Sequence, residues 1–325
     1  MSRPGGGLRR LRRSVRRRWK YRPGAIPWLL SLLARGLLAV VARLPEPWVM
    51  PLADRCARLA WWSARRRRLG RANVEQALPG IDPRRRDRMV RESCGHLGRR
   101  AAEAVVLARR PDRRALYEAR VAFEPGAREQ LEALRGSASI LVTPHLGSVE
   151  GLVLGLLTLG LRPTVPMRFP RNYYLDRQLH HARSRWGLEL VPRQGAVRHL
   201  LRAIRDGRPA LLAADQNAHH RPIFVPWFGR PAASERTPAV LALRSGAPLV
   251  VCWGWRKPGI EGWRIGCELV RPEAAPVEPE DELVHEWTAR LHNSLEQVIL
   301  RFPEQYLWVH DRYRTRPPAE ASPPA

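Results

Sequence analysis

The chain has 325 residues, enough to bury one large core with short appendages, and we expect one main domain. Its 57 Lys and Arg against 30 Asp and Glu give a net charge of +27, which predicts attraction to an anionic partner: nucleic acid, an anionic membrane, an acidic carrier protein or a phosphorylated substrate. The cysteines are scattered without a Cys-x-x-Cys pair, which argues against a zinc site and a disulfide framework. We expect no metal.

The first segment, residues 1–23, is a basic arm with almost no apolar periodicity. It contains Arg3, Arg9, Arg10, Arg12, Arg13, Arg16, Arg17, Arg18, Lys20 and Arg22. Because such a segment cannot bury an apolar face, we expect it to be disordered until it meets an anionic surface.

The second segment, residues 24–44, is predicted to be a membrane anchor. Residues 24–42 are apolar except for Arg35 and would form a helix about 28 Å long, close to the hydrocarbon thickness of a bilayer. Arg35 opposes insertion by about 2.5 to 3.5 kcal/mol at the bilayer centre. We expect a spanning or deeply inserted helix, and a helix in the membrane interface or in the protein core stays open.

Two further helical stretches follow at the start of the main domain, residues 45–316. Residues 48–68 form an amphipathic pattern with Trp61 and Trp62 before a run of arginines, a combination that suits the lipid headgroup layer or a solvated basic face. Residues 82–110 form a strongly charged helix that ends before Pro111.

From about residue 137 onward, short apolar stretches alternate with helical ones. This alternation predicts an α/β fold with a central sheet flanked by helices. We expect strands at 140–143, 164–167, 188–191, 210–213, 248–253 and 264–270, and helices at 151–161, 172–186, 195–206, 237–245 and 281–302. The Pro-rich tail, residues 317–325, is expected to be disordered.

The most informative motif is His145-Leu-Gly147-Ser-Val-Glu150, which lies where a predicted strand gives way to a helix. His145 in the turn is a candidate general base, and Glu150 in the first helical turn is a candidate to orient its ring. The alternative is structural: His145 caps the helix and Glu150 interacts favourably with the helix N-terminus.

Two more polar residues follow the ends of predicted strands. Arg168 comes after the strand at 164–167, and Asp215 comes after the strand at 210–213. Because active sites of open α/β sheets gather at strand ends, both are placed to converge on His145. Arg168 would bind a phosphate or stabilise an oxyanion, with Asp215 holding it in place. Alternatively, Arg168 is a surface residue and Asp215 caps a loop.

The order of these motifs resembles the bacterial lipid A secondary (lauroyl/myristoyl) acyltransferases, a branch of the lysophospholipid acyltransferases. The resemblance extends from Arg71-Ala72-Asn73 to the C-terminal stretch 302–312. The motifs that carry it are His145-x-Gly147-x-x-Glu150, Met167-Arg168-Phe169 leading to Asn172 and Asp176, Gly187 to Pro192, Asp215-Gln216, Phe224 to Gly229, Thr237-Pro238-Ala239 and Gly246-Ala247-Pro248.

The resemblance implies a mixed, mostly parallel sheet and an O-acyltransferase over residues 45–316. His145 and Glu150 would form the charge-relay pair, and Arg168, Asp215 and backbone N–H groups near Gly147 would support the substrate or the oxyanion. The chain departs from the family in having Ser148-Val149 where Asn-Trp usually precedes the acidic residue, which leaves the acceptor less defined than the reaction.

The resemblance also implies the partners and the location. The donor would be an acyl thioester on acyl carrier protein, or acyl-CoA, and the acceptor an anionic glycolipid at the cytoplasmic face of the inner membrane. No cofactor is expected. Acyl transfer to a phosphatidylinositol mannoside, a lysophospholipid or an amino-acid lipid remains an alternative. A nucleic-acid-binding protein would explain the charge but not the apolar helix or the motifs, so no nucleic-acid partner is expected.

Overall fold

The computed structural model describes residues 23–110, 113–167, 172–219, 221–257, 262–270 and 280–317. The centre of this part is a seven-stranded sheet with the order β1-β9-β8-β2-β5-β3-β4. Neighbouring strands run parallel except β8 and β9, so the predicted mixed, mostly parallel sheet is confirmed. The strands are β1 (Val121–Phe123), β2 (Ile140–Thr143), β3 (Thr164–Met167), β4 (Glu189–Pro192), β5 (Ala210–Ala213), β8 (Leu249–Trp255) and β9 (Trp263–Val270).

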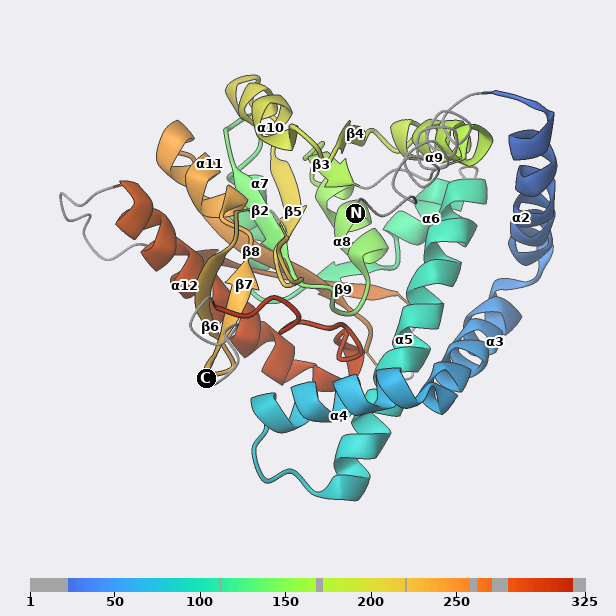
Figure 1. The fold of residues 1–325 in the computed structure, drawn as a ribbon. Helices are drawn as coiled ribbons and strands as arrows, with labels where there is room; N and C mark the ends of the chain where they lie inside the picture. Colours follow the sequence, from blue (N-terminus) through green and yellow to red (C-terminus); the bar gives the residue numbers. More distant parts are fainter. Residues whose placement is uncertain are drawn as a thin grey trace, which may run out of the picture.

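Helices cover both faces of the sheet (Figure 1). Along β2 the side chains alternate: Ile140 and Val142 enter one apolar core, and Leu141 enters the other. The first core is closed by α10 (Ala196–Arg205), α11 (Thr237–Ser245) and α12 (Glu280–Arg301), and the second by α8 (Val149–Thr158) with α6 (Arg114–Glu118), α7 (Ala127–Glu132) and the C-terminal half of α5 (Pro83–Arg109). The helix α9 (Tyr173–Ser184) precedes β4.

The central strands place their carboxyl ends at one edge of the sheet. β2 pairs with β5 on one side and with β8 on the other, in both cases parallel. Thr143, the last residue of β2, lies opposite Ala213, the last residue of β5. The segments that follow these two strands therefore leave the sheet side by side.

A two-stranded antiparallel hairpin outside the main sheet was not predicted. It consists of β6 (Ile223–Trp227) and β7 (Arg230–Ser234). The two residues of the turn, Phe228 and Gly229, have φ angles of 48° and 75°. Two positive φ angles are typical of the tight turn that joins the strands of a hairpin. In the sequence, Pro226 and Pro231 argue against a strand at either position, because proline lacks the N–H that a strand donates. In the structure the two prolines lie opposite each other in the hairpin.

The N-terminal helices pack on the side of α5. They are α2 (Ala25–Arg43), α3 (Glu46–Arg58), the 3₁₀ turn η1 (Leu59–Trp62) and α4 (Ala64–Ala77), so the single helix expected over 48–68 is broken near Ser63. In Figure 1, α2 and α3 lie at the right and α4 at the bottom. α3 packs tightly on α5, because Gly98 leaves room for the backbone of α3: a Cβ there would stand 2.1 Å from the Ala53 carbonyl oxygen.

The expected helix at 24–44 is present, but its expected membrane span is not borne out. Among the described residues, the structure contains no helix whose length and apolar character suffice to cross a membrane. α2 lies against the domain instead of extending away from it. Asn172 Nδ2 donates to the Pro27 carbonyl at 2.8 Å, and Gly24 N–H donates to the Tyr174 hydroxyl at 3.3 Å. The arm 1–22 and the residues from 318 onward lie outside the described residues.

Candidate active site

The parallel pairing of β2 and β5 brings His145 and Asp215 together. Each residue lies two positions beyond the paired strand ends Thr143 and Ala213. The Asp215 carboxylate contacts His145 twice: Oδ1 is 2.6 Å from Nδ1 of the ring, and Oδ2 accepts the His145 backbone N–H at 2.8 Å. Two contacts to one residue fix both the position and the rotation of the imidazole.

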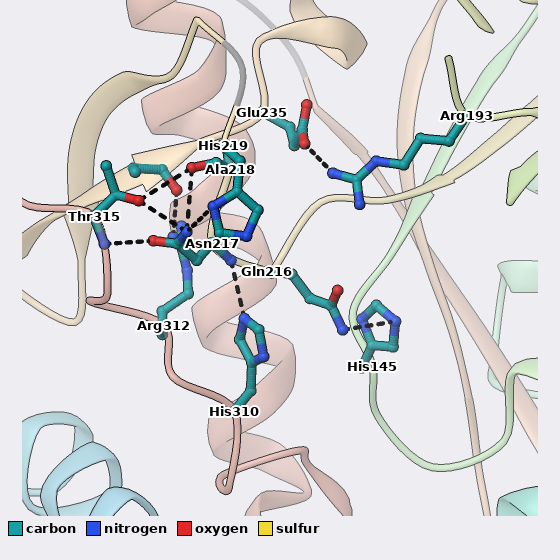
Figure 2. A network of polar contacts seen from close by, with 11 residues as sticks. His145, Arg193, Gln216, Asn217, Ala218, His219, Glu235, His310, Arg312 and Thr315 are labelled. Atoms are coloured by element: carbon teal, nitrogen blue, oxygen red, sulfur yellow. Dashed lines mark hydrogen bonds and ion pairs between the residues drawn. The ribbon is translucent and has the colours of Figure 1, made fainter. Parts of the chain in front are cut away.

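The surroundings of Asp215 determine which ring nitrogen carries the proton. Burial raises the pKa of Asp215, but its hydrogen bonds to His145 and the attraction of the imidazolium outweigh burial and hold the pKa at about 2. An ionised carboxylate only accepts hydrogen bonds, so Nδ1 of His145 carries the hydrogen and Nε2 of the neutral ring is an acceptor. The side chain of Gln216 lies 3.3 Å from Nε2, as Figure 2 shows.

A second histidine and the C-terminal segment support the loop after β5 (Figure 2). Asn217 N–H donates to His310 Nε2 at 3.1 Å, and Thr315 N–H donates to the Asn217 side-chain oxygen at 2.9 Å. Asn73 of α4 donates to the carbonyls of Trp308 and His310 at 2.6 and 2.8 Å. Distant parts of the chain thereby hold the loop that carries Asp215.

Every backbone N–H from His145 to Ser148 already has an acceptor. His145 N–H donates to Asp215, Leu146 N–H to the Pro144 carbonyl at 2.8 Å and Gly147 N–H to the Gln305 carbonyl at 3.0 Å. Ser148 N–H donates to the Gly254 carbonyl at 2.7 Å. These four groups are therefore engaged within the protein, and the role of N–H groups near Gly147 toward an oxyanion stays a prediction.

Comparison with known proteins identifies the family to which this site belongs. A model of the family described as bacterial lipid A biosynthesis acyltransferase matches residues 20–315, nearly the whole chain. The chain belongs to this family. It is therefore an acyltransferase, and all the site residues described above lie within the matched range.

Individual relatives agree with the family match. The acyltransferase is 28% identical over 301 residues to the lipid A biosynthesis palmitoleoyltransferase of Escherichia coli K12, covering 90% of this chain and 94% of that protein. It is also 28% identical over 293 residues to the lauroyltransferase of the same organism, covering 89% and 92%. A lipid A biosynthesis acyltransferase of Haemophilus influenzae is 24% identical over 193 residues, covering 59% and 58%.

A buried ion pair fixes the turn that carries His145. Glu103 of α5 binds the guanidinium of Arg256, with Oε1 2.6 Å from Nε, and both side chains are nearly inaccessible. Glu103 also accepts the Ser148 hydroxyl at 2.6 Å and the Trp263 indole N–H at 3.1 Å. Arg256 donates in turn to the Gly147 carbonyl at 3.0 Å.

The Glu103–Arg256 pair of the acyltransferase was not predicted, although the sequence contains an indication of it. Glu103 is the single charged residue in the otherwise apolar stretch 101–108 of its helix. A charged side chain in such an apolar, buried stretch is expected to have a partner of opposite charge. Ser148, noted as a departure from the family, is the N-cap of α8: its hydroxyl accepts the Gly151 N–H at 2.8 Å.

The remaining predicted site residues have different outcomes. Glu150 lies in the first turn of α8, but no hydrogen bond joins it to His145 in the described structure, and Asp215 takes the position expected for it. Glu150 is only five residues from His145 along the chain, but the carboxylate that contacts the His145 ring comes from Asp215, which follows the adjacent parallel strand. Arg168 lies outside the described residues.

A narrow cavity lies between α5 and α8. Its volume is about 20 Å³, room for about one water molecule, and it is lined by Ala104, Leu107, Glu150, Val153, Leu154 and Trp186 among others. Most of α8 is packed into the core. No group of three or more His, Cys, Asp or Glu side chains in the described ranges could hold a metal ion.

Proposed function

We propose that this acyltransferase moves a fatty acyl chain from an acyl thioester to a hydroxyl group of a lipid A precursor. The observation that carries the proposal is the His145–Asp215 pair, an imidazole held by a buried carboxylate, whose second nitrogen is an acceptor that the Gln216 amide contacts. The names of the relatives, which are lipid A palmitoleoyl- and lauroyltransferases, support the choice of acceptor.

The proposed reaction needs one base and no covalent enzyme intermediate. His145 Nε2 removes the proton of the acceptor hydroxyl as its oxygen attacks the thioester carbonyl carbon, and Asp215 stabilises the imidazolium that results. The tetrahedral intermediate then collapses, the carbon–sulfur bond breaks, and the departing thiolate takes the proton from His145. The products are an ester and a free thiol, and His145 returns to its neutral form.

We further propose that the donor is acyl carrier protein and that the enzyme acts at the cytoplasmic face of the inner membrane. An exposed apolar surface on the N-terminal helices supports membrane contact: Ile26, Trp28, Leu29, Leu30, Leu32, Leu33, Val40, Trp48 and Leu52 are all exposed. Indole rings and aliphatic side chains beside a basic protein surface suit the interface of an anionic bilayer. The net charge of +27 suits an acidic donor protein as well.

The proposal predicts distinct kinetic effects for the three ionisable residues near β2. With purified protein, an acyl thioester and a lipid A precursor, His145→Ala should lower kcat by about 10² to 10⁴, the usual contribution of a general base. Asp215→Asn should cause a loss of similar size, because the amide no longer fixes the Nδ1–H tautomer or stabilises the imidazolium. Glu150→Gln should retain more activity than Asp215→Asn.

Asp206→Asn is a matched control for Asp215→Asn, because Asp206 is exposed at the C-terminal end of α10. It should behave as wild type. Turnover of His145→Ala close to that of wild type would contradict the mechanism. A larger loss for Glu150→Gln than for Asp215→Asn would assign the orienting role to Glu150.

A further inference from the structure

Arg100 belongs to α5, the helix whose Glu103 accepts the Ser148 hydroxyl at the end of the turn that carries His145. α5 and α8 pack against each other and run in the same direction, since Glu103 bonds to Ser148 at the start of α8 and the residues after Glu103 line the cavity with Glu150 and Leu154. Arg100 precedes Ala104 by one helical turn on the same face. By this register it lies beside the residues that precede Ser148.

The charge of Arg100 interacts with carboxylates at and beside the active site. Burial lowers the pKa of Arg100, while attraction to Asp215, Glu150 and Glu103 raises it and repulsion from Arg256 lowers it. A guanidinium remains protonated in all ordinary conditions, so Arg100 presents a permanent positive charge near the His145–Asp215 pair.

Arg100 also differs from the other arginine at this edge of the sheet. Arg256 is occupied by Glu103 and by the Gly147 carbonyl. No hydrogen bond or ion pair joins the partly buried side chain of Arg100 to any residue in the described ranges. Its five N–H donors are thus available to a ligand.

The reaction requires such a donor. As the acceptor oxygen attacks, negative charge develops on the thioester oxygen, and stabilising it is usually the largest single contribution to catalysis of this kind. The four backbone N–H groups from His145 to Ser148 are already bonded within the protein. A side-chain donor is therefore a candidate for this role, and a guanidinium offers charge-assisted hydrogen bonds.

We propose that Arg100 binds the carbonyl oxygen of the acyl thioester and stabilises the oxyanion of the tetrahedral intermediate. This role rests on the proposed function. The carbonyl carbon gains the bond to the acceptor oxygen while the carbonyl π electrons move to the oxygen that Arg100 binds. When the carbonyl re-forms, the carbon–sulfur electrons leave with the thiolate, which is protonated by His145.

The test compares Arg100→Gln and Arg100→Lys with Arg88→Gln in the full-length enzyme, using an acyl thioester and a lipid A precursor. Arg88 is an exposed arginine on the same helix, about three turns from Arg100, and its replacement removes the same charge. Arg100→Gln should lower kcat by about 10² to 10³ with little change in the KM of the thioester, the size found for one oxyanion donor. Arg100→Lys should lose less than Arg100→Gln, and Arg88→Gln should match wild type.

Chemical rescue separates binding of the oxyanion from a structural role. Millimolar guanidinium should restore part of the kcat of Arg100→Ala but none of that of His145→Ala. A kcat of Arg100→Gln within threefold of wild type, a loss confined to KM, or a lack of rescue in folded Arg100→Ala would overturn the proposal. An inactive wild-type enzyme would instead contradict the proposed function, because that outcome does not depend on Arg100.

Discussion

At the scale of single residues, Glu103 holds together the turn on which the active site depends. Its carboxylate accepts hydrogen bonds from Arg256, Ser148 and Trp263 while only 5% of its surface is exposed. A buried ion pair adds little stability over an apolar pair, but removal of one partner leaves the other charge buried without compensation. Removal of one partner therefore lowers the stability of the fold by much more than the intact ion pair contributes to it.

Glu103→Ala should lower the free energy of unfolding by about 3 to 5 kcal/mol, because Arg256 would keep its buried charge. Urea denaturation followed by circular dichroism measures this loss. Glu132→Ala is the control, since Glu132 pairs with Arg128 at the surface, where such pairs contribute about 0 to 1 kcal/mol. Equal losses of unfolding free energy in the two variants would show that the Glu103–Arg256 pair behaves like an exposed ion pair.

The site residues differ in how far the sequence could predict them. His145 and Asp215 follow apolar strands, and the rule that active sites lie at strand ends places them in one site. Their direct pairing could not be deduced, because it depends on β2 and β5 being neighbours, and two other predicted strands separate them along the chain. Closeness in sequence predicts Glu150 as the partner of His145, whereas hydrogen bonding depends on closeness in space.

At the scale of elements, buried apolar strands and capped helices were predicted well. The bounds of β2, β3, β5 and α11 match the expected ranges, because each is a compact apolar stretch between turn residues. β1, β6 and β7 were missed: β1 is three residues long, and prolines interrupt the other two. The hairpin is instead stabilised by its contacts with α12, which only the tertiary structure supplies.

The exposed apolar surface of α2 and α3 predicts binding to anionic membranes. Leu30 and Leu33 are 65% and 81% exposed, so neither side chain belongs to the core. Clustered exposed aliphatic side chains of this kind indicate a surface that contacts a membrane or another protein. The double variant Leu30→Glu with Leu33→Glu should lower the fraction of protein that sediments with vesicles containing anionic lipid, because it replaces apolar surface by charges that the headgroups repel.

Leu269→Glu is the control for this experiment. Leu269 is an exposed leucine of β9, away from the N-terminal helices, so its replacement adds a negative charge without altering the α2–α3 surface. Binding of the double variant equal to that of the control would mean that this surface does not contact the membrane.

At the scale of the whole molecule, buried titratable groups set the response of the fold to acid. Burial lowers the pKa of His292 to about 3, so the folded protein keeps this ring neutral. In the unfolded chain a histidine takes a proton near pH 6.5. Below that pH the unfolded state binds a proton that the folded state does not, and the free energy of unfolding falls by up to about 1.4 kcal/mol per pH unit until about pH 3.

The stability of the wild-type protein should therefore decline from pH 6.5 downward, measured by urea denaturation at several pH values. The pKa of Asp215, held at about 2, adds a further loss only below about pH 4, where the unfolded carboxylate becomes protonated. His292→Leu removes one titrating group and should make the decline between pH 6.5 and pH 4 shallower. An unchanged slope would mean that His292 is protonated in the folded protein.

The central proposal is that the protein esterifies a lipid A precursor by means of the His145–Asp215 pair. The most direct test is mass spectrometry of the lipid after incubation of the purified enzyme with an acyl thioester and that precursor. We predict a product heavier by one acyl group less one hydrogen, formed at similar rates by the wild type and Asp206→Asn and at least about a hundredfold more slowly by His145→Ala. Product formation by His145→Ala at the wild-type rate, or no acylated lipid with the wild type, would contradict this account.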